Sequence, residues 1–551
     1  MTEHMIIIVI LVIIHLHYSL TIKTGTLGYN FIASTYRDNI NIPSHERQAL
    51  YDLYVSTNGA DWNYLDGDLG HWNFTDPDVN PCSSSDPWQG LNCTVISSDT
   101  INYFYYYISE IKLSHYNLRG TIPESIGNFS ELFYLNISFN YLYGSLPKTI
   151  YELTNLQFFD AENNSFKDVL SNNIYQLYNL QHLDIRRNNF YSTIPATIGN
   201  LTKLKFCRIS FNYFSGKLPT TIGYLIKLNL LSVDYNHFIG TIPDSIQYLT
   251  MLDMLSFNHN HLSGMIPPGI GDLRNLTHLS LSNNHLNGTL PETLSNLNSL
   301  VSLIVAFNSL SGVIPTWVSK LNNVTTLLFD NNHFSGNIPT VICQLSLLKS
   351  LGFGSNYLYG TIPSCLGKLS HILIVILSSN QFSGNIPFSF SDLISLRVLD
   401  MADNLLTGSI TDVFSSLPAL NALLLQDNFF TGTVPISLAN LSSLSGLFLQ
   451  NNTLQGKLDQ VFNGSSQKSL RYIQLSNNQF TGELPEQLFY SSSLISVSAV
   501  SNCFHGTIPS SICLNNQLKI LALDGLVCAS SCQTKILVFL CQQSIHNWWY
   551  P

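Results

Sequence analysis

The stretch LTHLSLSNNHLNGTLPETLSNLNS, residues 276–299, is followed at once by LVSLIVAFNSLSGVIPTWVSKLNN, residues 300–323. The two stretches have the same length of 24 residues and align position by position, so that Asn284 in the first corresponds to Asn308 in the second. A fixed period of this length is typical of a solenoid, in which each repeat forms one coil and buries its apolar side against its neighbours.

The period extends along most of the chain when the repeats are aligned on proline. The prolines in one phase are Pro123, Pro147, Pro195, Pro219, Pro243, Pro267, Pro291, Pro315, Pro339, Pro363, Pro387 and Pro435. Other residues fill the missing steps, and these are Ser171, Thr411 and Asp459. After an insertion of two residues, Pro485 and Pro509 resume the spacing. The sequence therefore predicts about 17 repeats of 24 residues.

Two further positions recur in nearly every repeat. An asparagine lies seven residues before the proline position, and only the first repeat departs, with Tyr116. A buried amide there can satisfy backbone groups of neighbouring coils, which are costly to leave unpaired. A glycine follows four residues after the asparagine, except at Asp168 and Ser192. Glycine permits a turn that a side chain would obstruct.

The residues before each asparagine predict a short strand. In LQHLDIRR, Leu183 and Ile185 alternate with His182, Asp184 and Arg186, and this period of two indicates a strand with one buried face. One strand per coil stacks into a parallel sheet. Because neighbouring strands lie about 4.8 Å apart, such strands would line roughly 80 Å of surface.

Segments such as NNHLNGTLPETLSNLNSL resemble the plant-type leucine-rich repeat, L-x-x-L-x-L-x-x-N-x-L-x-G-x-I-P-x-x-L-G-x-L, over roughly residues 111–514. The resemblance implies an α/β-type solenoid: a right-handed superhelix with a concave parallel β-sheet and a second short strand near the L-x-G-x-I-P segment. Proteins of this family serve as ectodomains of receptor-like kinases, as receptor-like proteins, and as secreted inhibitors.

The segment before the repeats resembles the N-terminal capping domain of the same family. Its residues Ala49, Leu50, Leu53 and Tyr54 have helical spacing. The element C-x-n-W-x-G-x-x-C follows, with matching residues Cys82, Trp88, Gly90 and Cys93. We expect Cys82 and Cys93 to form a disulfide, and the Tyr-rich segment before residue 111 to form a hairpin that leads into the first repeat.

These features divide the chain into five parts. We expect a signal peptide or signal anchor in 1–22, a linker in 23–43, the N-terminal cap in 44–110, the repeats in 111–512, and a C-terminal cap and tail in 513–551. The apolar run in the first part is too short for a comfortable membrane span and fits a secretory signal. The chain is therefore expected to be secreted or extracellular, with a membrane anchor through this run as the alternative.

Composition and sequons agree with that compartment. The net charge is −10 and only 11% of residues are charged, which argues against nucleic acid as a partner. We expect exposed, glycosylated sequons at Asn73, Asn128, Asn200, Asn275, Asn287, Asn323 and Asn440. Three other sequons, at Asn136, Asn163 and Asn451, fall on concave positions and are expected to be poorly occupied.

The remaining cysteines carry less information. Cys207 stands where the repeat has a strand leucine, so it is expected to be a small core residue. Cys343 and Cys365 fall on the far side of adjacent coils and are left unpaired. Five cysteines follow residue 500, and because that number is odd their pairing stays open.

The chain has no motif of a hydrolase, kinase or metalloprotease, and we expect neither an enzyme nor a cofactor or metal. Asp160, Glu162 and Asp184 could form a carboxylate cluster for acid–base chemistry, but a charged binding face explains them better. His259 and His261 could bind a metal, although solvated turn histidines are the more common case.

The outward residues of the second to sixth repeats combine charges of both signs with aromatic rings, the residue types enriched in binding hot spots. The candidate ligand-binding residues are Phe158, Asp160, Glu162, Asp184, Arg186, Arg187, Arg208, Phe211, Asp234 and Tyr235. In the alternative interpretation, Asp184 and Arg208 merely pair across adjacent strands. We expect replacement of Arg186 and Arg208 by alanine to weaken binding and to leave thermal stability nearly unchanged.

The expected function is recognition of an extracellular protein, peptide or glycan on the concave face. The chain would then be receptor-like without its own kinase, with a co-receptor kinase as a possible partner. The alternatives are a secreted inhibitor of a hydrolase and a structural adhesion protein of the wall or matrix. A localised concave patch favours recognition or inhibition over a purely structural role.

Overall fold

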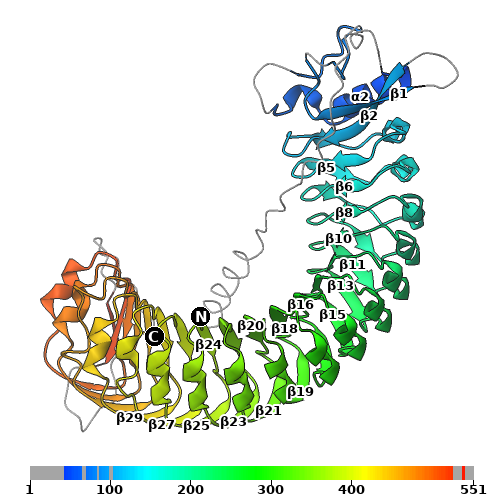
Figure 1. The fold of residues 1–551 in the computed structure, drawn as a ribbon. Coiled ribbons are helices and arrows are strands. Elements are labelled where there is room, and N and C mark those ends of the chain that lie inside the picture. Colours follow the sequence, from blue (N-terminus) through cyan, green and yellow to red (C-terminus); the bar gives the residue numbers. More distant parts are fainter. Residues whose placement is uncertain are drawn as a thin grey trace.

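The computed structural model describes residues 42–64, 70–77, 79–83, 86–97, 104–524 and 536–539. The expected signal segment, the linker up to residue 41 and most of the C-terminal tail lie outside these residues. Within them, every helix is too short or too polar to span a lipid bilayer. The described chain winds into an arc of stacked coils, with one continuous sheet along the inner side and short helical turns along the outer side (Figure 1).

The inner sheet has 20 strands. It begins with β1 (Leu91–Ser97), antiparallel to β2 (Phe104–Lys112), and ends with β36 (Ile520–Asp524), antiparallel to β37 (Ile536–Phe539). The strands between them are parallel and in register. They are β4 (Tyr134–Asn136), β6 (Phe158–Asp160), β8 (His182–Asp184), β10 (Phe206–Arg208), β12 (Leu230–Ser232), β14 (Met254–Ser256), β16 (His278–Ser280), β18 (Ser302–Ile304), β20 (Thr326–Leu328), β22 (Ser350–Gly352), β24 (Ile374–Ile376), β26 (Val398–Asp400), β28 (Ala422–Leu424), β30 (Gly446–Phe448), β32 (Tyr472–Gln474) and β34 (Ser496–Ser498).

A second row of short strands follows the ladder asparagines. Its members are β3 (Arg119–Gly120), β5 (Tyr141–Gly144), β7 (Ser165–Phe166), β9 (Tyr191–Ser192), β11 (Tyr213–Gly216), β13 (His237–Gly240), β15 (His261–Met265), β17 (His285–Gly288), β19 (Ser309–Val313), β21 (His333–Gly336), β23 (Tyr357–Thr361), β25 (Gln381–Gly384), β27 (Leu405–Ser409), β29 (Phe429–Gly432), β31 (Thr453–Gly456), β33 (Gln479–Gly482) and β35 (Cys503–Phe504). The row is interrupted between β7 and β9. There the repeats carry Asp168 and Ser192 in place of glycine.

The helical elements begin with α2 (Ser44–Ser56) and η1 (Gly59–Asp61) in the cap. One 3₁₀ turn per coil then follows the proline position in most repeats. These turns are η2 (Glu124–Asn128), η3 (Lys148–Glu152), η4 (Asn172–Gln176), η5 (Ala196–Asn200), η6 (Thr220–Tyr224), η7 (Asp244–Tyr248), η8 (Pro268–Asp272), η9 (Glu292–Asn296), η10 (Thr316–Lys320), η11 (Thr340–Gln344), η12 (Ser364–Lys368), η13 (Phe388–Asp392), η14 (Phe414–Ser416), η15 (Ile436–Asn440), η16 (Glu486–Tyr490) and η17 (Ser510–Leu514).

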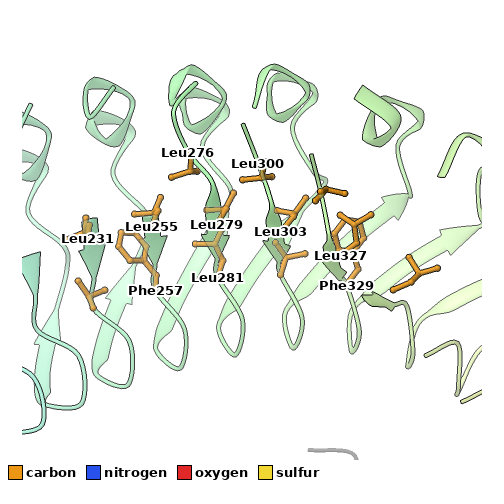
Figure 2. Close-up of a cluster of buried hydrophobic side chains, with 14 of the residues drawn as sticks. Leu231, Leu255, Phe257, Leu276, Leu279, Leu281, Leu300, Leu303, Leu327 and Phe329 are labelled. Carbon is orange, nitrogen blue, oxygen red and sulfur yellow. The ribbon is translucent and has the colours of Figure 1, made fainter. Parts of the chain in front are cut away.

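The core is a continuous column of leucine, isoleucine and phenylalanine between the two rows of strands. Leu255, Leu279 and Leu303 occupy equivalent positions in successive coils, and Phe257 and Leu281 lie beside them, all fully buried (Figure 2). The column extends through the described coils, so each coil is stabilised by contact with its two neighbours. Cys207 is buried in this column, as its strand position predicted.

The recurring asparagine forms a hydrogen-bonded ladder between coils. The Nδ2 of Asn236 donates to the carbonyls of Ile209, Val233 and Asp234 at 3.1, 3.0 and 3.2 Å, and its Oδ1 accepts from the amide of Phe214 at 3.0 Å. Each ladder asparagine thus joins its own coil to the preceding one. These bonds supply the pairing of buried backbone groups that the sequence predicted.

The N-terminal cap covers the first coil with aromatic rings. Helix α2 buries Leu50 and Leu53, and the buried rings of Trp62 and Trp72 lie 4.8 Å apart between centroids. Cys82 and Cys93 form a disulfide, which is the pairing expected from the resemblance. The hairpin of β1 and β2 carries the chain from the cap into the repeats.

One expectation about cysteines is wrong. Cys343 in η11 and Cys365 in η12, which were left unpaired, form a disulfide between adjacent coils. Their separation is 22 residues, two less than a full repeat. The same offset of 22 separates a ladder asparagine from the amide it accepts, for example Asn236 from Phe214, so residues at this offset lie side by side in adjacent coils.

Candidate ligand-binding face

Two aromatic ladders run across the first coils on the concave side. The first, which we call the strand ladder, occupies the leading position of successive strands: Tyr134 in β4, Phe158 in β6, His182 in β8 and Phe206 in β10. Ring centroids lie 4.1 Å apart between Tyr134 and Phe158 and 4.2 Å apart between Phe158 and His182. Parallel strands in register place equivalent side chains one above another, so the rings stack.

The second, which we call the turn ladder, lies immediately before the ladder asparagines. The guanidinium carbon of Arg187 lies 5.3 Å from the centre of the Phe211 ring. Phe211 stacks on Tyr235 at 4.3 Å, and Tyr235 stacks on His259 at 4.0 Å. All four residues have a positive φ between 51° and 55°, a left-handed conformation that bulky side chains seldom adopt. The turn ladder therefore presents exposed rings at some conformational cost.

Charged side chains fill the strip between the two ladders. Arg186 donates from Nε to both oxygens of Asp184, at 2.8 and 3.0 Å, and its NH2 nitrogen lies 2.7 Å from the carboxylate of Glu162. Arg208 lies 3.6 Å from Asp184. Arg187 lies 3.8 Å from Glu162 and keeps about half of its side chain exposed. Asp184 is buried, so Arg186 is its main compensating charge.

Burial changes the protonation of this strip. The pKa of Asp160 is raised to about 7, mainly because the carboxyl is desolvated and then because Asp184 lies close to it. Desolvation also raises the pKa of Glu162, against the opposing effect of Arg186. Burial between Phe158 and Phe206 lowers the pKa of His182 to about 4. His182 is therefore a neutral ring of the strand ladder at physiological pH.

Asp234 has a different role from the other candidate residues. Its Oδ2 accepts from the hydroxyl of Ser232 at 2.6 Å. Its Oδ1 accepts from the hydroxyl of Ser256 at 2.6 Å and from the amide of Asn258 at 2.7 Å. With both oxygens engaged across two coils, Asp234 holds the end of the charged strip in place.

The structure brings the predicted residues together as one surface. Phe158 belongs to the strand ladder, Phe211 and Tyr235 to the turn ladder, and the three carboxylates and three arginines lie between them. Sequence reasoning did not select four further members of the ladders, which are Tyr134, His182, Phe206 and His259. The signal for them was present, because each lies 24 or 48 residues from a selected aromatic position.

The ion pairs correct one expectation. Asp184 and Arg208 do pair across adjacent strands, as the alternative interpretation stated, and Arg186 is tied to two carboxylates. Removal of Arg186 would leave the buried Asp184 without its main partner, so we expect this replacement to lower stability rather than to leave it nearly unchanged. Arg187, Phe211 and Tyr235 are the better probes of binding, because they are exposed.

Two suggested chemistries fit the geometry poorly. Asp160, Glu162 and Asp184 bring carboxylate oxygens within 4.8 Å of one another, but guanidinium groups already bind the oxygens of Glu162 and Asp184. His259 stacks on Tyr235, and His261 stacks between His237 and His285. The described strip is therefore suited to contact rather than to catalysis or metal binding.

Comparisons with known proteins agree with this geometry. Leucine-rich-repeat family models match residues 370–430 and, separately, residues 179–201, 251–273, 275–297, 323–345 and 469–490. Among curated protein sequences, none matches this chain.

Solved structures of plant receptors are similar to this chain. The plant peptide hormone receptor RGFR1 in complex with RGF2 is 31% identical, with 75% of this chain and 70% of that chain covered and a TM-score of 0.68. The TDR receptor is 29% identical, with coverage of 74% and 82% and a TM-score of 0.62. The Arabidopsis receptor kinase HAESA, in complex with the peptide hormone IDA and the co-receptor SERK1, is 25% identical, with coverage of 87% and 94% and a TM-score of 0.53.

The 24-residue coils, the asparagine ladder, the aromatic cap and these similarities point to one family. The similar structures are receptors, one of them in complex with RGF2, and the matching family models describe leucine-rich repeats. The chain belongs to the leucine-rich-repeat proteins of the plant receptor-ectodomain type.

Proposed function

We propose that this chain is an extracellular recognition module that binds a peptide on its concave face, over the coils of β4 to β12. The observation that carries the proposal is the charged strip held between two aromatic ladders. Its side chains lie on strands fixed by the core, and several are already held by ion pairs or ring stacking. A ligand therefore meets groups that have little conformational entropy left to lose on binding.

A peptide fits this surface better than a polyanion or a lipid. The strip combines three carboxylates with three arginines, so it offers complementary partners for both signs of charge. The rings of both ladders present mainly their edges, because their faces are stacked on each other. Structural neighbours include receptors in complex with peptide hormones, which supports a peptide ligand here.

The same neighbours support an extracellular site of action and a second protein partner. The similar HAESA ectodomain forms a complex with both its peptide hormone and the co-receptor SERK1. By analogy, a co-receptor kinase would supply the signal that the described repeats, which lack a kinase motif, do not provide.

The test is a pull-down from extracellular extract with the tagged full chain, compared with the triple variant Arg187→Ala, Phe211→Ala, Tyr235→Ala. A matched control removes one exposed arginine and two exposed rings elsewhere, in Arg397→Ala, Tyr357→Ala, Phe429→Ala. We expect the binding variant, but not the control, to lose the recovered ligand. Equal recovery by all three proteins would refute the proposed face. Recovery of a hydrolase would favour the inhibitor function.

A further inference from the structure

The turn ladder has a missing ring beyond His259. In successive coils this position holds Phe211, Tyr235, His259, Asn283 and Phe307, each with a positive φ. Three consecutive rings stack, and then Asn283 interrupts the series before Phe307 continues it. The free face of His259 and the near face of Phe307 therefore flank a coil that supplies no ring of its own.

The gap has the thickness of one ring. His259 and Phe307 are two coils apart, which is about 9.6 Å along the stack. The stacked pairs of the ladder are separated by 4.3 and 4.0 Å, so two such steps nearly fill that distance. One further planar group can lie above Asn283 and contact a ring on each side.

A groove lies over this gap. It has a volume of about 560 Å³, and Tyr235, His259, Asn283 and Phe307 are among the residues that line it. Three exposed histidines, His237, His261 and His285, also line it, and their rings stack at 6.0 and 5.7 Å. Its lining residues include no carboxylate, lysine or arginine. A neutral planar group suits such a lining better than a charged one.

The exposure of Phe307 supports a binding role. Its side chain is 40% exposed and its φ is 56°, so it gains little from burial and bears the cost of a left-handed conformation. Equivalent positions further along the chain carry Asn331 and Ser355, which adopt the same conformation without a ring. The coil itself does not require the ring, and a contact with a ligand would account for it.

A second gap in the same series, at Asn163, has different flanking residues. It lies between Phe139 and Arg187 rather than between two rings. The gap at Asn283 is therefore the one that a planar ligand group can enter.

We propose that the groove is an anchor site for one aromatic side chain of the peptide, which inserts between His259 and Phe307. This inference rests on the proposed function, because the turn ladder continues from the charged strip into the groove. Arg187, at the other end of the ladder, has a loosely paired and exposed guanidinium, which complements an acidic residue. Four coils separate Arg187 from Asn283, or about 19 Å, and an extended peptide spans this in about six residues.

The first experiment defines the ligand pattern. A phage-displayed library of random linear dodecapeptides is selected on the full chain, with its N-glycans trimmed to the first sugar. We expect selected peptides to carry a tyrosine, tryptophan or phenylalanine about six residues from an aspartate or glutamate. Selection of peptides without an aromatic residue, or of none at all, would overturn the inference.

The second experiment measures the groove directly, by fluorescence anisotropy with one selected peptide and its aromatic→Ala form. Asn283→Phe places the protein's own ring in the gap. It should lower the affinity for the parent peptide about tenfold and leave the affinity for the alanine form unchanged. Asn331→Phe adds the same ring at nearly the same φ, 54°, outside the groove and should change neither affinity. Phe307→Ser removes one of the two rings that flank the gap and should also weaken binding of the parent peptide, which keeps the test valid if Asn283→Phe fails to fold.

The variants separate the two proposals. Arg187→Gln should lower the affinity for both peptide forms equally, because it removes the charge contact and not the ring contact. If Arg187→Gln loses binding but Asn283→Phe and Asn331→Phe bind the parent peptide with equal affinity, the anchor site is refuted. The proposed binding face would then remain supported. Unchanged binding by all of these variants would refute both.

Discussion

At the scale of single residues, Arg186 and Arg187 are adjacent but have different roles: Arg186 stabilises the fold through ion pairs, and Arg187 is available to a ligand. Arg186 compensates the buried Asp184 and also binds Glu162, whereas Arg187 lies 3.8 Å from Glu162 and is half exposed. We expect Arg186→Ala to lower the free energy of unfolding by about 1–3 kcal/mol, since Asp184 keeps only Arg208 nearby. Arg187→Ala should cost less than about 0.5 kcal/mol. Urea titration of both variants measures this, and equal losses would contradict the assignment.

Asp330 gives a pH dependence with a definite sign. Its carboxyl is buried beside the Gly354 amide, and burial raises its pKa to about 7, above roughly 3.9 in the unfolded chain. Between these values the folded state keeps a proton that the unfolded state has lost. Its contribution to stability is therefore present at low pH and is lost as pH rises through 7.

The test is the variant Asp330→Asn, whose side-chain oxygen can still accept from the Gly354 amide. We expect the melting temperature of the wild type to fall between pH 5 and 8, and that of the variant to fall less. At pH 8 the difference in stability loss between the two proteins should be on the order of 2 kcal/mol. Asp403→Asn, which removes an exposed carboxylate, serves as the control. Parallel profiles for wild type and Asp330→Asn would rule out the effect.

At the scale of the elements, the asparagine ladder stabilises the boundary between coils. Asn236→Ala removes three donated hydrogen bonds and one accepted bond, and it leaves the buried amide of Phe214 without its acceptor. We expect a loss of about 2–4 kcal/mol in local stability. Because coils contact only their neighbours, hydrogen exchange should quicken in the coils around Asn236 and not at the distant end. Asn189→Ala, outside the ladder, should leave exchange unchanged.

The elements also show what could be predicted from sequence. The coils, the inner sheet and the asparagine ladder follow from contacts that repeat every 24 residues, so a period alone predicts them. The bifurcated hydrogen bond from Arg186 Nε to the two oxygens of Asp184 lies within one coil and depends on side-chain rotamers, which no period specifies. The Cys343–Cys365 disulfide was missed because adjacent coils bring residues 22 apart side by side, an offset that alignment at 24 conceals.

At the scale of the whole molecule, the inner and outer sides of the arc have different surfaces. The inner side is formed by the strands of the 20-stranded sheet (Figure 1). Its first coils carry the ladders and the charged strip. The outer side carries the 3₁₀ turns and the disulfide between η11 and η12. Five expected glycosylation sites lie in or just after these turns: Asn128, Asn200, Asn275, Asn323 and Asn440. A partner on the inner side would therefore meet few glycans.

Glycan occupancy should follow this division. The five outer asparagines are exposed, as are Asn73 in the cap and Asn287 in β17, so all seven side chains are accessible for glycosylation. Asn136 is half-buried on the concave sheet, and its Oδ1 accepts from both the amide and the hydroxyl of Ser138. A glycan on its Nδ2 would project from the concave sheet and cover the ring of Tyr134 or Phe158, so we expect Asn136 to be largely unmodified.

The measurement is secretion from a eukaryotic host, enzymatic removal of the glycans in heavy-oxygen water, and mass spectrometry of each sequon peptide. High occupancy at the outer sites with little at Asn136 is the expected result. Asn136→Gln should leave the total glycan mass unchanged, whereas Asn200→Gln should reduce it by one chain. Full occupancy at Asn136 would mean that a sugar chain lies on the proposed face, and a peptide could not then reach the strand ladder. Absence of glycans at every site would instead count against the secretory route, and with it against an extracellular ligand.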